Sequence, residues 1–160
     1  MMAMLHVEVS TTVKASRPTV FDVYADYAAW PRLFPTIGAV RLLARQGPKL
    51  VLEVDHVEGK VRNELVVRPP DAIDLWEEKR HYDARFSNRF ETAAGGTRFT
   101  VRGDIRLKGW ARLLQPFLGG HVRRQIQRLQ QQPVKAEAEA RTRQAAEAAT
   151  RDRGRARGAE

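Results

Sequence analysis

The stretch GWARLLQPFLGGHVRRQIQRLQQ, residues 109–131, decides how the rest of this 160-residue chain can fold. Its large apolar side chains recur at steps of three and four, the pattern of one face of an α-helix. These side chains are Trp110, Leu113, Leu114, Phe117, Leu118, Val122, Ile126 and Leu129. Pro116 and the pair Gly119–Gly120 predict a kink in this helix, or its division into a short piece and a long one. An amphipathic helix of this length needs an apolar surface on which to lie.

The sequence before this helix predicts that the surface is an antiparallel sheet. Apolar and polar residues alternate in residues 5–13, and six further segments with strand character follow between residues 40 and 106. Short turns such as Glu58–Gly59 and Gly95–Gly96 separate most of these segments, so neighbouring strands run antiparallel. Two short helices are expected between Pro18 and Pro35. The polar sides of the strands are strongly charged, which indicates that one face of the sheet is in water.

Length and composition indicate one folded domain. We expect it to span residues 1–131, followed by an Ala-, Arg- and Glu-rich tail, residues 132–160, that is either mobile or a helical extension. The absence of cysteine excludes disulfides, zinc–thiolate sites and thiol nucleophiles. The first ten residues lack the pattern of a signal peptide, and no run is long enough for a membrane span. A soluble, cytoplasmic protein is expected.

The net charge of +9 is concentrated late in the chain. Residues 1–105 carry a net charge of +1, whereas residues 106–131 hold six basic residues and no acidic one. No nucleic-acid recognition motif accompanies this charge, so a nucleic-acid partner is not expected. Two interpretations remain: a solvated helix face, or a docking surface that meets an anionic membrane through Arg123, Arg124 and Arg128.

Several local motifs resemble one family. VKASRPTVFDV at 13–23 and DYAAWPRL at 26–33 are similar to the opening of the polyketide cyclase/dehydrase and lipid-transport branch of the SRPBCC, or START-like, superfamily. GTRFTV at 96–101 resembles its penultimate strand, and LKG at 107–109 the start of its last helix. The resemblance covers residues 5–131. It implies an α+β helix-grip fold (START/Bet v 1-like): a seven-stranded antiparallel sheet wrapped around a long C-terminal helix, with two short helices after strand 1.

The resemblance also implies an apolar pocket for lipids, quinones, polyketides or other hydrophobic small molecules, and strand alternation identifies polar residues that could face it. His56, Asn63, Tyr82 and Asn88 are in phase with apolar neighbours. Each must find a hydrogen-bond partner or a ligand, because an unsatisfied buried polar group costs about 1–3 kcal/mol. They either contact a ligand, or bond to one another, to water or to solvent at a strand end. The apolar residues expected to bind the ligand are Leu52, Val54, Leu65, Phe86, Phe99, Val101, Trp110, Leu114 and Phe117.

Cofactor and metal chemistry are not expected. The four histidines are scattered without metal-ligand spacing, and no phosphate- or dinucleotide-binding glycine motif is present. If a reaction is catalysed, His56 is the best base and Tyr82 the best proton donor or oxyanion partner. The strand arginines that could guide enolate chemistry are out of phase with the apolar faces, which disfavours a cyclase. They are Arg62, Arg68, Arg85, Arg89, Arg98, Arg102 and Arg106.

Three hypotheses for function follow. The first is a carrier or binding protein for a hydrophobic small molecule, without a cofactor and active as a monomer or weak dimer. The second is a polyketide aromatase/cyclase or dehydratase-like enzyme. The third is an interaction module with a filled core and no pocket. Whether helix and sheet close on each other, or leave a cavity, distinguishes the third hypothesis from the first two.

Overall fold

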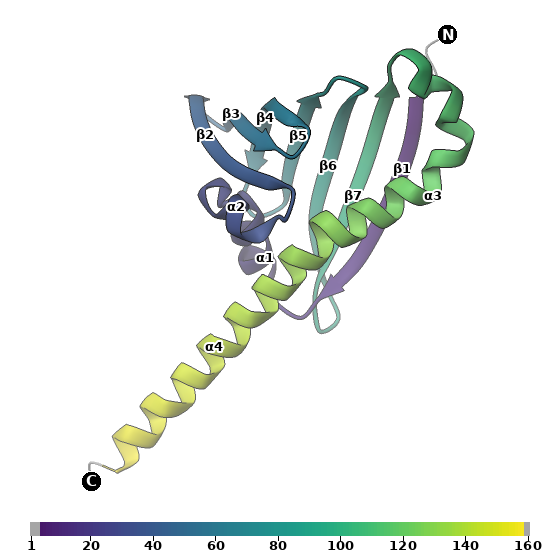
Figure 1. Ribbon diagram of the computed structural model, residues 1–160. Coiled ribbons are helices and arrows are strands. Elements are labelled where there is room, and N and C mark those ends of the chain that lie inside the picture. Colours follow the sequence, from purple (N-terminus) through teal and green to yellow (C-terminus); the bar gives the residue numbers. More distant parts are fainter. Residues whose placement is uncertain (1–3, 159–160) are drawn as a thin grey trace.

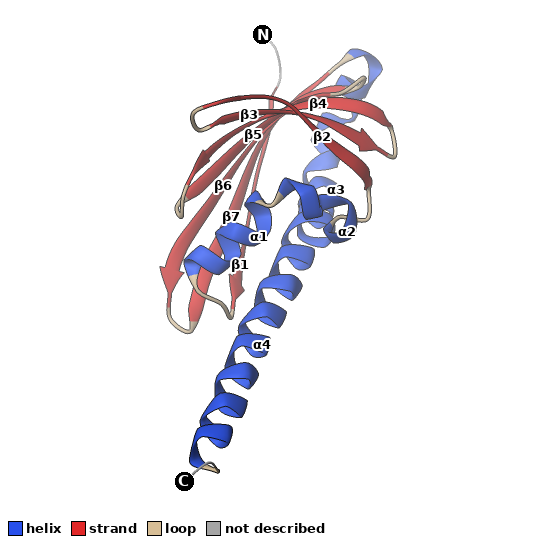
Figure 2. Ribbon diagram, turned by 90° about the vertical axis from the view of Figure 1, so that its left-hand side faces the viewer, coloured by secondary structure: helices blue, strands red, loops and turns tan. Residues whose placement is uncertain are grey.

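The computed structural model describes residues 4–158 and contains one curved, fully antiparallel sheet (Figures 1 and 2). The spatial order of its strands is β1-β7-β6-β5-β4-β3-β2, so every strand except β1 pairs with its neighbour in sequence. The predicted seven-stranded sheet is thereby confirmed. The strands are β1 (Met4–Val13), β2 (Ile37–Gln46), β3 (Lys49–His56), β4 (Gly59–Arg68), β5 (Ala72–Glu78), β6 (Tyr82–Ala93) and β7 (Gly96–Leu107).

The alternation in the sequence sets which face of the sheet is buried. Cross-strand pairs such as Leu65↔Leu75 and Phe90↔Phe99 carry one continuous apolar surface across the strands. The opposite face carries the strand arginines; Arg68 and Arg89 there form ion pairs with Asp74, at 2.6 and 2.8 Å.

Two short helices and a single turn follow β1, as predicted: α1 (Arg17–Ala25), η1 (Tyr27–Ala29) and α2 (Trp30–Leu33). Ser16 caps α1, and its side chain accepts a hydrogen bond from the backbone N–H of Thr19 at 3.3 Å. α1 packs on β6 and β7 and places Phe21 edge-on to Phe90, with ring centroids 5.7 Å apart. The aromatic core therefore lies between α1 and the far ends of β6 and β7.

The C-terminal helical region begins after β7 and follows the sheet before it extends away from it (Figure 1). It comprises η2 (Gly109–Leu114), α3 (Gln115–Ile126), the π-helical turn η3 (Gln127–Gln131) and α4 (Gln132–Arg157). The predicted division falls at Pro116, which occupies the first turn of α3, where its missing N–H costs nothing. Gly119 and Gly120 lie inside α3 and do not break it.

The segment after residue 131 is helical and partly packed. Val134 and Ala138 are fully buried, and the Lys135 ammonium donates to the Thr12 carbonyl at 2.9 Å. Burial therefore extends past the boundary predicted at residue 131, because two small apolar side chains suffice where α4 crosses α1. From Thr142 the helix is exposed and projects beyond the sheet (Figure 2). Among residues 4–158, no helix is long and apolar enough to cross a membrane.

Half of the apolar stripe predicted in residues 109–131 does not face the sheet. Trp110, Leu113, Leu114 and Phe117 are exposed, whereas Ile126 is buried. The reason is geometric: η2 is a 3-10 helix, and α3 begins beside β1, the edge strand, where Gln115 donates to the Met4 carbonyl at 3.2 Å. The stripe reaches the apolar face of the sheet only further along α3.

Candidate functional site

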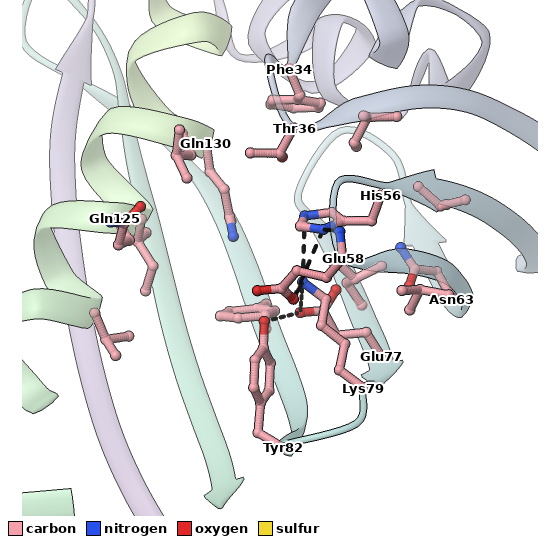
Figure 3. A pocket seen from close by; sticks show the side chains of 18 of the residues that line it. Phe34, Thr36, His56, Glu58, Asn63, Glu77, Lys79, Tyr82, Gln125 and Gln130 are labelled. Atoms are coloured by element: carbon pink, nitrogen blue, oxygen red, sulfur yellow. Dashed lines mark hydrogen bonds and ion pairs between the residues drawn. The ribbon is translucent and has the colours of Figure 1, made fainter. Parts of the chain in front are cut away.

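A cavity of about 580 Å³ separates the inner face of the sheet from the C-terminal helical region. Helix and sheet therefore do not close on each other completely. The cavity wall comes from α1, α2, strands β2 to β7, α3 and η3 (Figure 3). The apolar residues on its sheet side include Ile37, Val54, Val61, Leu75, Phe86, Ile105 and Leu107, and those on its helix side include Leu118, Val122, Ile126 and Leu129.

An aromatic cluster closes the cavity on the side of α1 and α2. Tyr24, Trp30 and Phe34 contact one another edge-on, with ring centroids 5.9 to 6.1 Å apart. The Trp30 indole N–H donates to the Tyr24 carbonyl at 2.8 Å, which fixes the indole against the wall. All three side chains are buried, so this wall is closely packed.

The opposite side of the cavity holds a polar cluster centred on Lys79, just after β5. The Lys79 Nζ lies 3.4 Å from His56 Nε2, 3.5 Å from Glu58 Oε2 and 3.9 Å from Glu77 Oε1. It also lies 5.2 Å from the centroid of the Tyr82 ring. The Tyr82 hydroxyl donates to Glu77 Oε1 at 3.4 Å (Figure 3). Lys79 thus connects the two polar groups, His56 and Tyr82, that the sequence places on the inner face.

Burial controls the protonation of this cluster. Burial and then the Lys79 cation lower the pKa of His56, while Glu58 opposes them. Burial raises the pKa of Glu77, although Lys79 and the Tyr82 hydroxyl partly offset it. Burial, together with the charges of Glu77 and Glu58, raises the pKa of Tyr82. At neutral pH the imidazole is therefore neutral and the phenol protonated.

His56 also has a second neighbour, the backbone N–H of Glu58, which lies 3.4 Å from Nδ1. A neutral imidazole has one acceptor nitrogen, so it can accept from Lys79 or from this N–H, but not from both at once. The two neighbours therefore favour different tautomers of the His56 ring.

Two amide oxygens in the cavity wall are left without a protein donor. Among residues 4–158, no hydrogen-bond partner reaches Asn63 Oδ1 or Gln130 Oε1, and both atoms are buried. A buried acceptor without a donor is costly and points to a group that enters from the cavity, such as a ligand hydroxyl or a water molecule. Asn63 and Gln130 come from the sheet side and the helix side respectively.

The structure divides the residues predicted to bind the ligand into two sets. Val54, His56, Asn63, Tyr82 and Phe86 line the cavity. The others do not line it: Leu52, Leu65, Asn88, Phe99, Val101, Trp110, Leu114 and Phe117.

The residues outside the cavity lie elsewhere for two reasons. Asn88 and the apolar strand residues face inward but are covered by packing; the Asn88 amide donates to the Ile73 carbonyl at 3.0 Å. Trp110, Leu114 and Phe117 are exposed on the helical side, because α3 begins beside the edge strand β1. Contact of the five lining residues with a ligand stays a prediction.

Sequence reasoning did not select Lys79, Glu58 or Gln130. Lys79 and Glu58 follow the ends of strands, where alternation no longer assigns a face, and Gln130 lies in a π-helical turn that a 3.6-residue period does not predict. Glu77 did carry a signal, because it is in phase with Ile73 and Leu75. Within residues 4–158, no group of three or more His, Cys, Asp or Glu side chains could hold a metal ion.

Comparison with known proteins agrees with this architecture. The family described as polyketide cyclase/dehydrase and lipid transport matches residues 4–133. No curated protein matches the chain in sequence.

Solved structures share the fold. The Zhui aromatase/cyclase from Streptomyces sp. R1128 is 18% identical and superposes with a TM-score of 0.74 over 89% of this chain and 98% of its own. A START superfamily protein from Mycobacterium smegmatis is 20% identical, with a TM-score of 0.60 over 88% of this chain and 99% of its own.

The di-domain ARO/CYC StfQ from the steffimycin biosynthetic pathway is 18% identical, with a TM-score of 0.68 over 87% of this chain. The chain spans about half the length of StfQ, 52%. At these identities the likeness shows the helix-grip fold alone.

Proposed function

Because the chain belongs to the polyketide cyclase/dehydrase and lipid transport family, we propose that it binds a hydrophobic small molecule in the cavity between sheet and C-terminal helix. The ligand is lipid-, quinone- or polyketide-like, and the protein acts as its carrier or binding protein. The observation that carries this proposal is a preformed cavity of about 580 Å³ that combines an apolar wall with a few polar groups.

The polar groups indicate what the ligand carries. Lys79 and Tyr82 are donors, and the oxygens of Asn63 and Gln130 are acceptors without protein donors. Lys79 and Tyr82 already have protein partners, whereas the two amide oxygens need donors, so a ligand that carries hydroxyl groups on an apolar skeleton satisfies Asn63 and Gln130. A plain hydrocarbon chain leaves these two oxygens desolvated. For the carrier role, the membrane contact proposed for Arg123, Arg124 and Arg128 supplies a place where such a ligand is collected.

The first test is to denature freshly purified protein, analyse the organic extract by mass spectrometry, and compare it with native mass spectrometry of the intact protein. A stoichiometric oxygenated lipid, quinone or polyketide is the expected result. If the protein is recovered empty, it is next titrated with an isoprenoid quinone, a fatty acid and a polycyclic phenol.

Trp30 provides a reporter for that titration, because it lines the cavity. The double variant Trp76→Phe/Trp110→Phe leaves Trp30 as the sole tryptophan of the three in the chain. Quinone binding should quench its fluorescence saturably. Val122→Trp, tested by ligand displacement or mass spectrometry, should fill the cavity and abolish binding, whereas Leu113→Trp, a similar change on the exposed side, should not. Equal binding by both variants would place the ligand outside the cavity.

A second function is favoured by one observation: Lys79 connects His56 and Tyr82 along one side of the cavity. A neutral His56 could remove a proton from the carbon between two ketones, while Lys79 and Tyr82 stabilise the enolate oxygen. Attack of the enolate carbon on a second carbonyl carbon would then form the new ring bond and turn that carbonyl oxygen into an alkoxide. Tyr82 would protonate the alkoxide and regain its proton from the His56 imidazolium, and loss of the new hydroxyl as water would make the ring aromatic. This is the aromatase/cyclase hypothesis.

A poly-β-ketone thioester analogue tests it, with product followed by aromatic absorbance. His56→Gln and Tyr82→Phe should each lower the rate by about 10²–10⁴-fold. His6→Gln, on the exposed face of β1, is the matched control and should leave the rate unchanged. Binding of the analogue without turnover above the uncatalysed rate would reject the enzyme and keep the carrier.

A further inference from the structure

Large apolar side chains gather on the exposed side of η2 and the first turn of α3. Trp110, Leu113 and Phe117 are 66%, 81% and 81% exposed, and Leu114 between them is 41% exposed. We call these four residues the apolar patch. A contiguous group of large apolar side chains left in water is uncommon and marks a surface that something covers.

The charge beside the apolar patch is of one sign. Arg112, Arg123, Arg124 and Arg128 are exposed, and in the part of the chain that the structure describes none of them forms an ion pair with a protein carboxylate. No acidic residue occurs from 105 to 136. On the outer face of the sheet, by contrast, exposed arginines are paired, as in Arg102 with Glu8 at 2.7 Å. The helical surface is therefore complementary to an anionic partner.

The apolar patch and the basic residues form one surface that borders the cavity. Phe117, His121 and Arg124 are separated by four and three residues, so they follow one another along the same side of α3. Arg128 continues this line one turn later, in η3. His121 and Arg128 are exposed and also line the cavity, so they mark its mouth.

We infer that this surface docks on an anionic lipid bilayer, with the apolar patch at the boundary between headgroups and acyl chains and the arginines on lipid phosphates. Trp, Phe and Leu on one part of a helix and Arg on another is the composition of an interfacial element. Docked in this way, the protein presents its cavity mouth to the bilayer. The inference deepens the carrier hypothesis and rests on it for its purpose, but vesicle binding does not require an occupied cavity.

Cosedimentation with phosphatidylcholine vesicles, with and without 30% phosphatidylglycerol, tests the docking directly. Binding is expected to the anionic vesicles and to weaken as salt rises. Leu113→Gln/Phe117→Gln should lower the partition coefficient at least about tenfold. The matched control is Leu42→Gln/Leu43→Gln, an equal change at two exposed apolar residues of β2, which should leave binding within about twofold of wild type.

The charge contribution has its own pair of variants. Arg123→Gln/Arg124→Gln should weaken binding, whereas Arg151→Gln/Arg153→Gln, which removes the same charge from the projecting end of α4, should have a smaller effect. If both variants lose the same vesicle affinity, binding depends only on the net charge of the protein, and the proposed surface is wrong.

Insertion is read from tryptophan quenching by lipids brominated on their acyl chains. Brominated lipids should quench the tryptophan fluorescence of the wild-type protein and of Trp76→Phe. The fluorescence of Trp110→Phe should not be quenched by these lipids. Absence of wild-type binding to anionic vesicles, or binding that survives Leu113→Gln/Phe117→Gln, overturns the inference. A third outcome also overturns it: the wild-type protein does not bind vesicles but forms a dimer, and Leu113→Gln/Phe117→Gln abolishes that dimer. The apolar patch would then be an interface between two copies of the chain. A negative ligand extraction changes none of these results, so the two proposals fail separately.

Discussion

The inner face of the sheet is packed with side chains at one end and borders a cavity at the other. At one end, where β6 finishes and β7 begins, Phe90 and Phe99 stack with centroids 5.0 Å apart beneath α1, and both are fully buried. At the other end, Tyr82 and Leu107 pair across the same two strands but line the cavity. The alternation of residues is identical at the two ends, so the difference comes from what lies above them.

Helix placement explains the difference. Above the closed end, α4 packs on α1, and its small residues Val134 and Ala138 are fully buried, so the two helices approach closely. Gln131 holds the helix against β1 and β7 in this region, because its amide donates to the carbonyls of Val9 and Phe99 at 2.9 and 3.2 Å. Above the open end, α3 lies toward β1, and its Leu118 and Val122 are only partly buried. The cavity therefore forms where α3 stands away from the inner face of the sheet.

The largest expected effect comes from deleting an aromatic ring at the closed end. Phe99→Ala should lower the free energy of unfolding by about 3–5 kcal/mol, because it leaves a void in a packed core. Phe86→Ala, at the open end, should cost less, since that side chain already borders empty volume. Urea denaturation of both variants measures the contrast. Equal losses would mean that the open end is as tightly packed as the closed one.

A truncation pair tests where the folded domain ends. Removing residues 144–160 should change the free energy of unfolding by less than about 0.5 kcal/mol, because residues 144–158 are exposed. Removing residues 132–160 should cost about 2–4 kcal/mol, since Val134, Ala138 and the Lys135 contact with β1 are lost. Thermal and urea unfolding of both proteins distinguishes a packed α4 from a dispensable tail; loss of stability in the shorter deletion would contradict this assignment.

The smallest effect is a pH dependence at the open end. The pKa of His56 is lowered in the folded state, so the unfolded chain takes up a proton first as the pH falls below about 6.5. The stability contributed by neutral His56 is complete above that pH and is lost as the pH falls through the lowered pKa. His56→Gln should remove this part of the pH profile. Lys79→Met should raise the pKa of His56, measured by NMR titration; an unchanged pKa would show that Lys79 does not act on the ring.

Much of the fold follows from the sequence alone. Alternation in the strands and the three-to-four spacing of the late helix predict the seven-stranded sheet, its inner face and the long helix. They also place His56, Asn63 and Tyr82 on that face, since a two-residue period leaves a strand residue only two sides to choose from. The strand arginines are outside for the same reason.

The tertiary structure alone decides which inward residues meet a cavity. Asn88 and Tyr82 are equivalent by alternation, yet α1 covers the region of Asn88 while the helix stands away from Tyr82. Phe117 fits the helical period as well as Ile126 does, yet only Ile126 lies over the sheet. Periodicity specifies the direction of a side chain relative to its own backbone. The path of the helix across the sheet depends on contacts between distant segments, such as Gln131 with β1 and β7, which no local pattern contains.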